Sequence, residues 1–137
     1  MNNKLPINAS KPAQQQLNSL LKLYQTKHYS EAEKLAISIT QEFPKHQFAW
    51  KVLAAVLKQT YRISESLIVS QKSLQLEPKD SEAHNNLGIL LQEVGRLEEA
   101  ETSYKKAITL KPEYVEAHYN LGILLQEVGR LEEAETS

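Results

Sequence analysis

The chain has 137 residues, of which 41% are hydrophobic and 24% charged, a composition typical of one folded globular domain. Its 16 Lys and Arg residues are balanced by 17 Asp and Glu residues, so the basic excess expected of a nucleic-acid-binding protein is missing. The sequence contains no cysteine, which excludes disulfides, thiolate catalysis and cysteine-based zinc sites.

Residues 1–12 (MNNKLPINASKP) lack the apolar stretch of a secretory signal, and we interpret them as a lead segment before the first helix. No run in the chain approaches the roughly 18 to 20 apolar residues that cross a bilayer. We therefore expect no membrane association and a cytoplasmic location.

From residue 13 onward, apolar residues recur at helical spacing. The pattern predicts helices near residues 13–26, 30–42, 47–60, 64–76, 81–94, 98–110 and 115–128, with an incomplete one from about residue 131. The turns between them are short. Gly95 suits the left-handed backbone that ends a helix, and Pro112 stands where the next helix has to stop.

The residues that interrupt the helices recur with a period of 34 residues, as Pro44, Pro78 and Pro112 do, and as Gly95 and Gly129 do. Residues 82–103 and 116–137 agree at 21 of 22 positions. A fixed period of this length indicates a helical-repeat protein, in which stacked neighbours bury an apolar face that one repeat cannot bury alone. We expect four repeats, over residues 13–46, 47–80, 81–114 and 115–137.

Gly88 and Gly122 fall in the middle of predicted helices, where glycine costs about 1 kcal/mol relative to alanine. We expect a close approach of a neighbouring helix at both positions, because such an approach would offset the cost.

Two periods carry the pattern that resembles the tetratricopeptide repeat family. Its residues are Trp50, Leu53, Ala54 and Leu57 in one period, and His84, Leu87, Gly88, Leu91, Ala100, Tyr104, Ala107 and Pro112 in the next. The resemblance implies an all-α fold, a right-handed superhelical α-solenoid of antiparallel helix pairs with about three and a half repeats. The first repeat is divergent, with Leu20 at the small mid-helix position and Ala36 at the aromatic one, and the fourth is truncated in its second helix.

In this family the first helix of each pair lines a concave groove that holds an extended peptide or a partner helix. The resemblance implies a peptide-binding groove that contains Asn18, Lys51, Asn86, Ile89, Tyr119, Asn120 and Ile123. Asn85 also maps to the groove. Asn18, Asn86 and Asn120 are equivalent and are similar to an asparagine ladder in O-linked N-acetylglucosamine transferases that grips peptide backbone. The alternative is that these asparagines are merely solvated helix residues.

The basic clamp that holds chaperone tails in some family members matches only in part. Lys51 and Asn86 fit it, but Ala55, Glu116 and Asn120 stand where it needs an asparagine and two cations. We therefore expect no chaperone-tail binding. The acids in the later part of the groove favour a neutral or basic partner: Glu82, Glu93, Glu116 and Glu127.

No nucleophile, base and orienting group can be nominated by spacing, so we expect no enzyme and no cofactor. The histidines lack metal-ligand spacing, and we interpret His84 and His118 as packing between neighbouring repeats. The function predicted is a scaffold that binds a protein or extended peptide. The alternative is a noncatalytic, substrate-recruiting arm of a larger glycosyltransferase or sulfotransferase.

Ser137 falls partway through the last predicted helix, so we expect an array that continues beyond it. The last repeat is uncapped in this sequence. Its apolar residues are expected to fray or to mediate self-association: Leu121, Leu124, Leu125 and Leu131.

Overall fold

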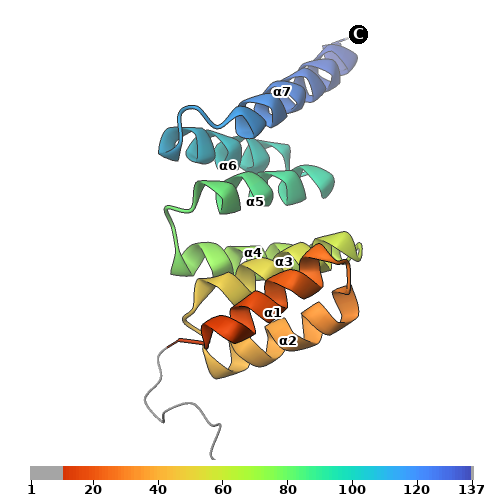
Figure 1. Ribbon diagram of the computed structural model, residues 1–137. Coiled ribbons are helices and arrows are strands. Elements are labelled where there is room, and N and C mark those ends of the chain that lie inside the picture. Colours follow the sequence, from red (N-terminus) through yellow and green to blue (C-terminus); the bar gives the residue numbers. More distant parts are fainter. Residues whose placement is uncertain (1–10, 137) are drawn as a thin grey trace, which may run out of the picture. The chain divides into compact units, whose positions relative to one another are not determined.

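The structure, a computed structural model, describes residues 11–136, which form helices and no strand (Figure 1). The helices are α1 (Gln14–Gln25), α2 (Tyr29–Glu42), α3 (Gln47–Gln59), α4 (Ile63–Leu76), α5 (Ser81–Glu93), α6 (Leu97–Leu110) and α7 (Val115–Thr136). Most of the predicted lead segment lies outside the described residues. The chain divides into two compact units: unit 1 ends at Leu76 and contains α1 to α4, and unit 2 starts at Glu77 and contains α5 to α7.

The first six helices agree with the predicted ranges to within one residue at either end. Their turns repeat one backbone conformation, since Lys27, Tyr61 and Gly95 have φ angles of 63°, 62° and 81°. These residues are 34 positions apart, so the left-handed turn predicted at Gly95 is confirmed and also recurs at two residues with side chains. The start of α5 is capped by Asp80, whose carboxylate accepts a hydrogen bond from the Ala83 amide at 3.1 Å.

In unit 1, α3 packs against α1, α2 and α4. The core of unit 1 contains the fully buried side chains of Leu20, Ala36, Ile39 and Val56. Leu20 and Ala36 occupy the positions of Gly88 and Tyr104 in the later repeat. The first repeat therefore places the large side chain on its first helix and the small one on its second.

In unit 2, α5 packs against α6 and α7, and α6 also packs against α7. Ala100, Ala107, Ala117 and Leu124 are completely buried, and the Tyr104 ring is 1% exposed. The Tyr104 ring lies against Gly88, which confirms the close approach predicted at that glycine.

The predictions for the last helix were wrong in two respects. α7 continues through Gly129, where a turn was expected, and no neighbouring atom lies within 4 Å of a Cβ built on Gly122. In α6, Tyr104 packs the second helix of the pair against the first.

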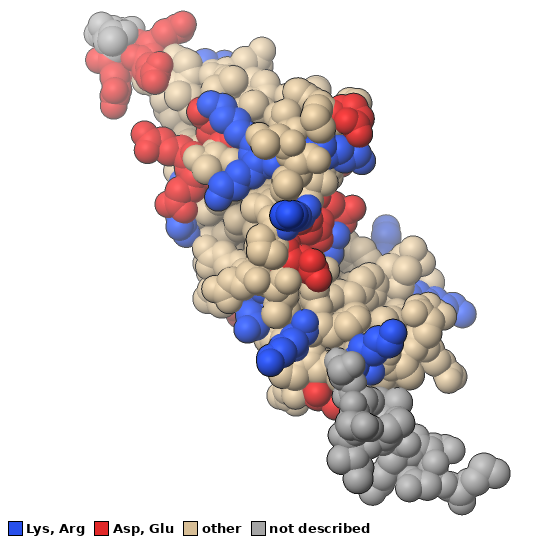
Figure 2. Space-filling model, turned by 90° about the vertical axis from the view of Figure 1, so that its left-hand side faces the viewer, with Lys and Arg blue, Asp and Glu red and all other residues tan. Residues whose placement is uncertain are grey.

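Charged side chains of both signs are interspersed on the face shown in Figure 2, and acidic ones gather at the C-terminal end of the chain. No helix within residues 11–136 has both the length and the apolar character needed to span a membrane.

Candidate polypeptide-binding faces

The predicted groove residues divide between the two units. Asn18 and Lys51 lie on α1 and α3 of unit 1, which pack side by side. The other five lie on the adjacent helices α5 and α7 of unit 2: Asn86, Ile89, Tyr119, Asn120 and Ile123. We call these two surfaces the α1–α3 face and the α5–α7 face. Of the three residues of the predicted asparagine ladder, Asn86 and Asn120 therefore share unit 2, whereas Asn18 belongs to unit 1.

On the α5–α7 face, Tyr119 and Ile123 are 68% and 41% exposed, and Asn86, Ile89 and Asn120 are half-buried. The Asn120 amide donates a hydrogen bond to the Asn85 side-chain oxygen at 3.2 Å. Asn85 itself is only 1% exposed, so its assignment to the open groove was wrong. Its side chain is buried because it joins α5 to α7, and Asn86 is the neighbouring amide that stays accessible.

A second polar contact between α5 and α7 is centred on Gln92. Its side-chain amide donates to the Glu127 carboxylate at 2.9 Å, and its oxygen accepts a hydrogen bond from the Tyr104 hydroxyl at 2.8 Å. Burial, with smaller contributions from the negative charges of Glu127 and Glu93, raises the pKa of Tyr104 to about 12. Tyr104 is thus a neutral donor that fixes Gln92, and Gln92 in turn holds Glu127 at the surface.

On the α1–α3 face, Asn18 is exposed and its side-chain oxygen accepts a hydrogen bond from Gln14 at 3.0 Å. Lys51 is half-buried on α3. Val52, which stands at the asparagine position in the second repeat, is 6% exposed and belongs to the core of unit 1. The interruption of the ladder at Val52 therefore has a packing cause.

The two faces carry opposite charges. Helices α1 and α3 contain three lysines and no acidic residue: Lys22, Lys51 and Lys58. Helix α5 and the part of α7 up to Val128 contain four glutamates and no Lys or Arg: Glu82, Glu93, Glu116 and Glu127. The overall balance of charges in the chain hides this difference, although it could have been found by counting charges helix by helix.

The histidines of the later repeats hold turns in place. The Nε2–H groups of His84 and His118 each donate to a proline carbonyl six residues earlier, Pro78 and Pro112, at 2.7 Å. Trp50 makes the same contact with Pro44 at 2.9 Å. The interpretation of the two histidines as packing between repeats is thus refined, because their ring nitrogens bind the turn that precedes their own helix.

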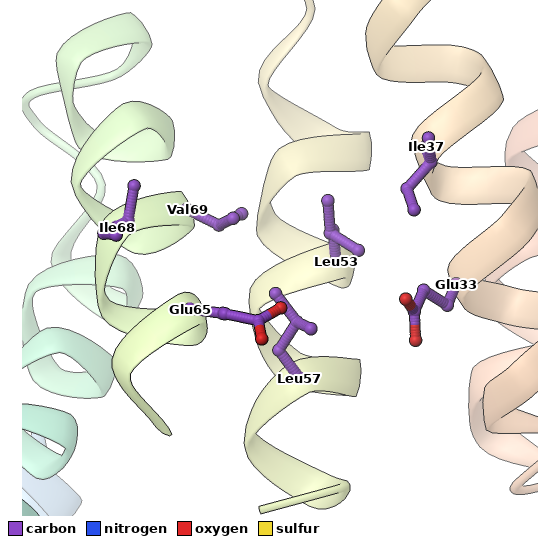
Figure 3. A pocket seen from close by; sticks show the side chains of 7 residues that line it. All are labelled: Glu33, Ile37, Leu53, Leu57, Glu65, Ile68 and Val69. Carbon is purple, nitrogen blue, oxygen red and sulfur yellow. The ribbon is translucent and has the colours of Figure 1, made fainter. Parts of the chain in front are cut away.

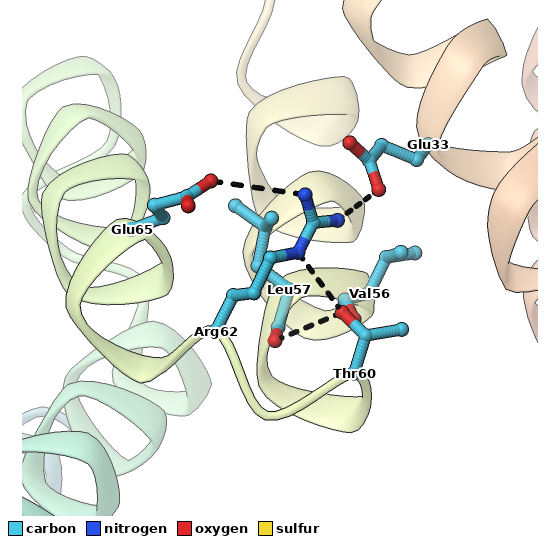
Figure 4. A network of polar contacts seen from close by, with 6 residues as sticks. All are labelled: Glu33, Val56, Leu57, Thr60, Arg62 and Glu65. Atoms are coloured by element: carbon cyan, nitrogen blue, oxygen red, sulfur yellow. Dashed lines mark hydrogen bonds and ion pairs between the residues drawn. The ribbon is translucent and has the colours of Figure 1, made fainter.

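Unit 1 also contains a pocket of about 270 Å³ that was not predicted from the sequence (Figure 3). It opens between the second helices α2 and α4 above α3, and is lined by Glu33, Ile37, Leu53, Leu57, Glu65, Ile68 and Val69. Arg62 lies at one end of it and binds Glu33 of α2 (Figure 4). No sequence signal would have revealed this site, since its residues are five ordinary aliphatic side chains and two glutamates drawn from three helices.

An all-α stack of antiparallel helix pairs with a 34-residue period defines the class of helical-repeat proteins. Family models agree: one described as "Tetratricopeptide repeat" matches residues 70–102, and one described as "TPR repeat" matches residues 93–129. Residues 70–129 therefore match models of the tetratricopeptide repeat, which agrees with the period and helix pairs of the chain. No curated protein matches it by sequence.

Solved structures share the fold at low sequence identity. The first TPR of Spaghetti (RPAP3), bound to the HSP90 peptide SRMEEVD, has a TM-score of 0.82 and 18% identity over 89% of this chain and 99% of its own. An O-GlcNAc transferase of Thermobaculum terrenum has a TM-score of 0.77 and 22% identity over 82% of this chain and 22% of its own. The Yersinia enterocolitica chaperone SycD, in complex with a peptide of the translocator YopD, has a TM-score of 0.77 and 18% identity over 87% of this chain and 93% of its own.

Proposed function

We propose that this chain is a scaffold that binds a protein or extended peptide on its first-helix faces. The observation that supports this function best is the α5–α7 face. It combines exposed apolar groups, Tyr119 and Ile123, with the accessible amide of Asn86. An amide offers both a donor and an acceptor to a peptide backbone, and apolar side chains flanking it add area to bury.

The structures of the first TPR of Spaghetti and of SycD each contain a peptide, which is consistent with a polypeptide ligand for this fold. The HSP90 peptide SRMEEVD is acidic, however, and the α5–α7 face carries four glutamates. For this face we therefore propose a neutral or basic segment, because a carboxylate-rich tail would be repelled.

The test is quantitative capture of partners from a cell extract, followed by affinity measurement for the partner that is identified. Asn86→Ala is the most informative variant because, among the described residues, Asn86 makes no side-chain hydrogen bond. We expect it to weaken binding about 5- to 10-fold, because the variant loses one or two hydrogen bonds to the backbone of the bound peptide. Binding that is unchanged would remove Asn86 from the site.

Asn120→Ala needs a folding control, because it also removes the hydrogen-bond donor of the buried Asn85. The matched control for both variants is Thr102→Ala on α6, where the hydroxyl only bonds the Glu98 carbonyl of its own helix. Partner binding that is lost in Thr102→Ala as well would place the interface outside the α5–α7 face.

A second proposed role is that of a noncatalytic arm that recruits polypeptide substrates for a larger glycosyltransferase or sulfotransferase. It is favoured by the likeness to O-GlcNAc transferase, of whose chain the matched region is 22%. The discriminating observation is the coding sequence that follows Ser137. A transferase domain there would support the arm, and repeats alone would support the scaffold.

We also propose self-association through the last helix. Leu125 and Leu131 of α7 are 47% and 54% exposed, although Leu124 is completely buried. Light scattering over a concentration series tests this role. A mass that stays at that of a monomer up to millimolar concentration would rule it out.

A further inference from the structure

We propose that the pocket between α2 and α4 is a second docking site, which takes an aliphatic side chain of a partner protein together with a lysine or arginine next to it. This site lies on the second helices of unit 1, so it is separate from the first-helix faces proposed above. It does not depend on them.

The pocket suits side chains better than a whole small molecule. Its floor is formed by Leu53 and Leu57 of α3, and Ile37 of α2 stands opposite Val69 of α4 (Figure 3). At about 270 Å³ it is smaller than a typical ligand site of roughly 300 to 1,000 Å³, yet larger than the roughly 150 Å³ that holds one benzene. One or two aliphatic side chains of a partner would fill it.

The pocket is open to a partner on the α2–α4 side. Ile37 and Ile68 are 37% and 68% exposed, although both are large apolar side chains. Packing a partner side chain against them removes apolar surface from water, which supplies the driving force for docking.

The charges at one end of the pocket favour a lysine or arginine next to the aliphatic side chain of the partner. Arg62 is bound to Glu33, and its Nε lies 3.4 Å from the Thr60 hydroxyl (Figure 4). The Glu65 carboxylate is 63% exposed and its closest approach to Arg62 is 3.8 Å, too long for a hydrogen bond. Two carboxylates thus share one guanidinium, and Glu65 has room for another cation.

The distribution of charge in unit 1 favours the same partner. Helices α2 and α4 carry four acidic residues and two lysines, so this side stays net negative even with Arg62 of the preceding turn: Glu31, Glu33, Glu42 and Glu65, with Lys34 and Lys72. The excess of lysines in unit 1 therefore lies on the first helices and in the turns. A basic segment is attracted to the second-helix side, whereas an acidic one is repelled from it.

Helix α4 also carries a lysine, Lys72, which is not among the residues that line the pocket. Lys72 lies over the Trp50 ring, with 5.9 Å from Nζ to the ring centroid. It follows Glu65 by seven residues on α4, which corresponds to about 10 Å along the helix. The cation of the partner is therefore expected next to Glu65, at a distance from Lys72.

The experiment uses the full chain and two capped tripeptides, in which two leucines flank either a lysine or a glutamate. Binding is followed through the methyl resonances of Ile37, Ile68 and Val69. We expect the lysine peptide to shift these resonances and the glutamate peptide to bind several-fold more weakly. Equal binding of the two peptides, or shifts elsewhere only, would overturn the proposal.

Two variants at exposed positions test the two parts of the site without threatening the fold. Ile68→Ala should weaken the lysine peptide about 5- to 10-fold through lost apolar contact. Glu65→Gln should weaken it about 2- to 5-fold, as expected for an exposed ion pair. The matched controls lie in unit 2: Val115→Ala, another exposed aliphatic residue, and Glu113→Gln, an exposed acid in the turn before α7. Both should leave the affinity unchanged.

Two results would assign the pocket to a different occupant. Binding that appears only after residues 1–10 are removed would mean that this segment of the chain fills the pocket itself. Methyl shifts that grow with protein concentration in the absence of peptide would mean that a second copy of the chain does. Either result would overturn the assignment to a partner protein.

Discussion

The Tyr104 ring occupies the space that a side chain on Gly88 would need. A Cβ atom built on Gly88 would lie 2.6 Å from Cε1 and 2.7 Å from Cδ1 of Tyr104, well inside van der Waals contact. The ring is 1% exposed and its hydroxyl is bound to Gln92, so it cannot move aside without losing that bond. The close packing of α6 on α5 therefore requires glycine at this position.

We expect Gly88→Ala to destabilise the protein by about 1–3 kcal/mol, since overpacking outweighs the gain in helix propensity of about 1 kcal/mol. Gly122→Ala is the matched control, because Gly122 is at the equivalent position of α7 and no atom lies within 4 Å of its added Cβ. It should be neutral or stabilising by up to about 1 kcal/mol. Thermal unfolding of both variants checks this, and equal effects would contradict the packing explanation.

The left-handed turns offer a stabilising substitution. Tyr61 has a φ of 62° and is 89% exposed, so its side chain contributes strain and little packing. We expect Tyr61→Gly to stabilise the protein by about 0.5–1 kcal/mol, because relief of left-handed strain exceeds the entropy cost of glycine. In the reverse direction, Gly95→Ala should destabilise by about 1 kcal/mol. Denaturant titrations would refute this reasoning if Tyr61→Gly lowered the midpoint.

Tyr104 makes stability depend on pH in the alkaline range. Its pKa of about 12 in the folded protein exceeds the value of 10.0 expected when it is unfolded. The folded state therefore keeps a proton that the unfolded state loses, and up to about 2–3 kcal/mol of stability disappears as the pH rises from 10 to 12. Tyr104→Phe should flatten this part of the curve. A wild-type curve that matches the variant above pH 10 would show that the hydroxyl titrates normally.

The bond from Trp50 to the Pro44 carbonyl predicts an unusual order of substitutions. Trp50→Phe keeps an apolar ring but loses the donor, which should cost about 0.5–1.5 kcal/mol. Trp50→His is smaller and more polar, yet it restores the donor that His84 and His118 supply in the later repeats. We expect the histidine variant to be the more stable of the two in thermal unfolding. The opposite order would mean that apolar burial alone decides this position.

The sequence by itself determined the period, the first six helices and the turn at Gly95, because helical spacing and breaker residues act within a few positions of one another. It also predicted the resemblance to tetratricopeptide repeats, through small and aromatic residues that recur every 34 positions. These signals can be read from the sequence alone, without knowing which side chains of neighbouring helices pack against one another.

Only the tertiary structure decided which residues become buried or exposed on the helix surfaces. Asn85 and Asn86 are adjacent and identical in chemistry, yet Asn85 is buried in a bond with Asn120 while Asn86 stays accessible. Likewise, Gly129 stays helical within α7, and the α2–α4 pocket exists because side chains of three helices meet around it. In each case the outcome depends on which neighbour fills a volume, and packing between helices distant in sequence settles that.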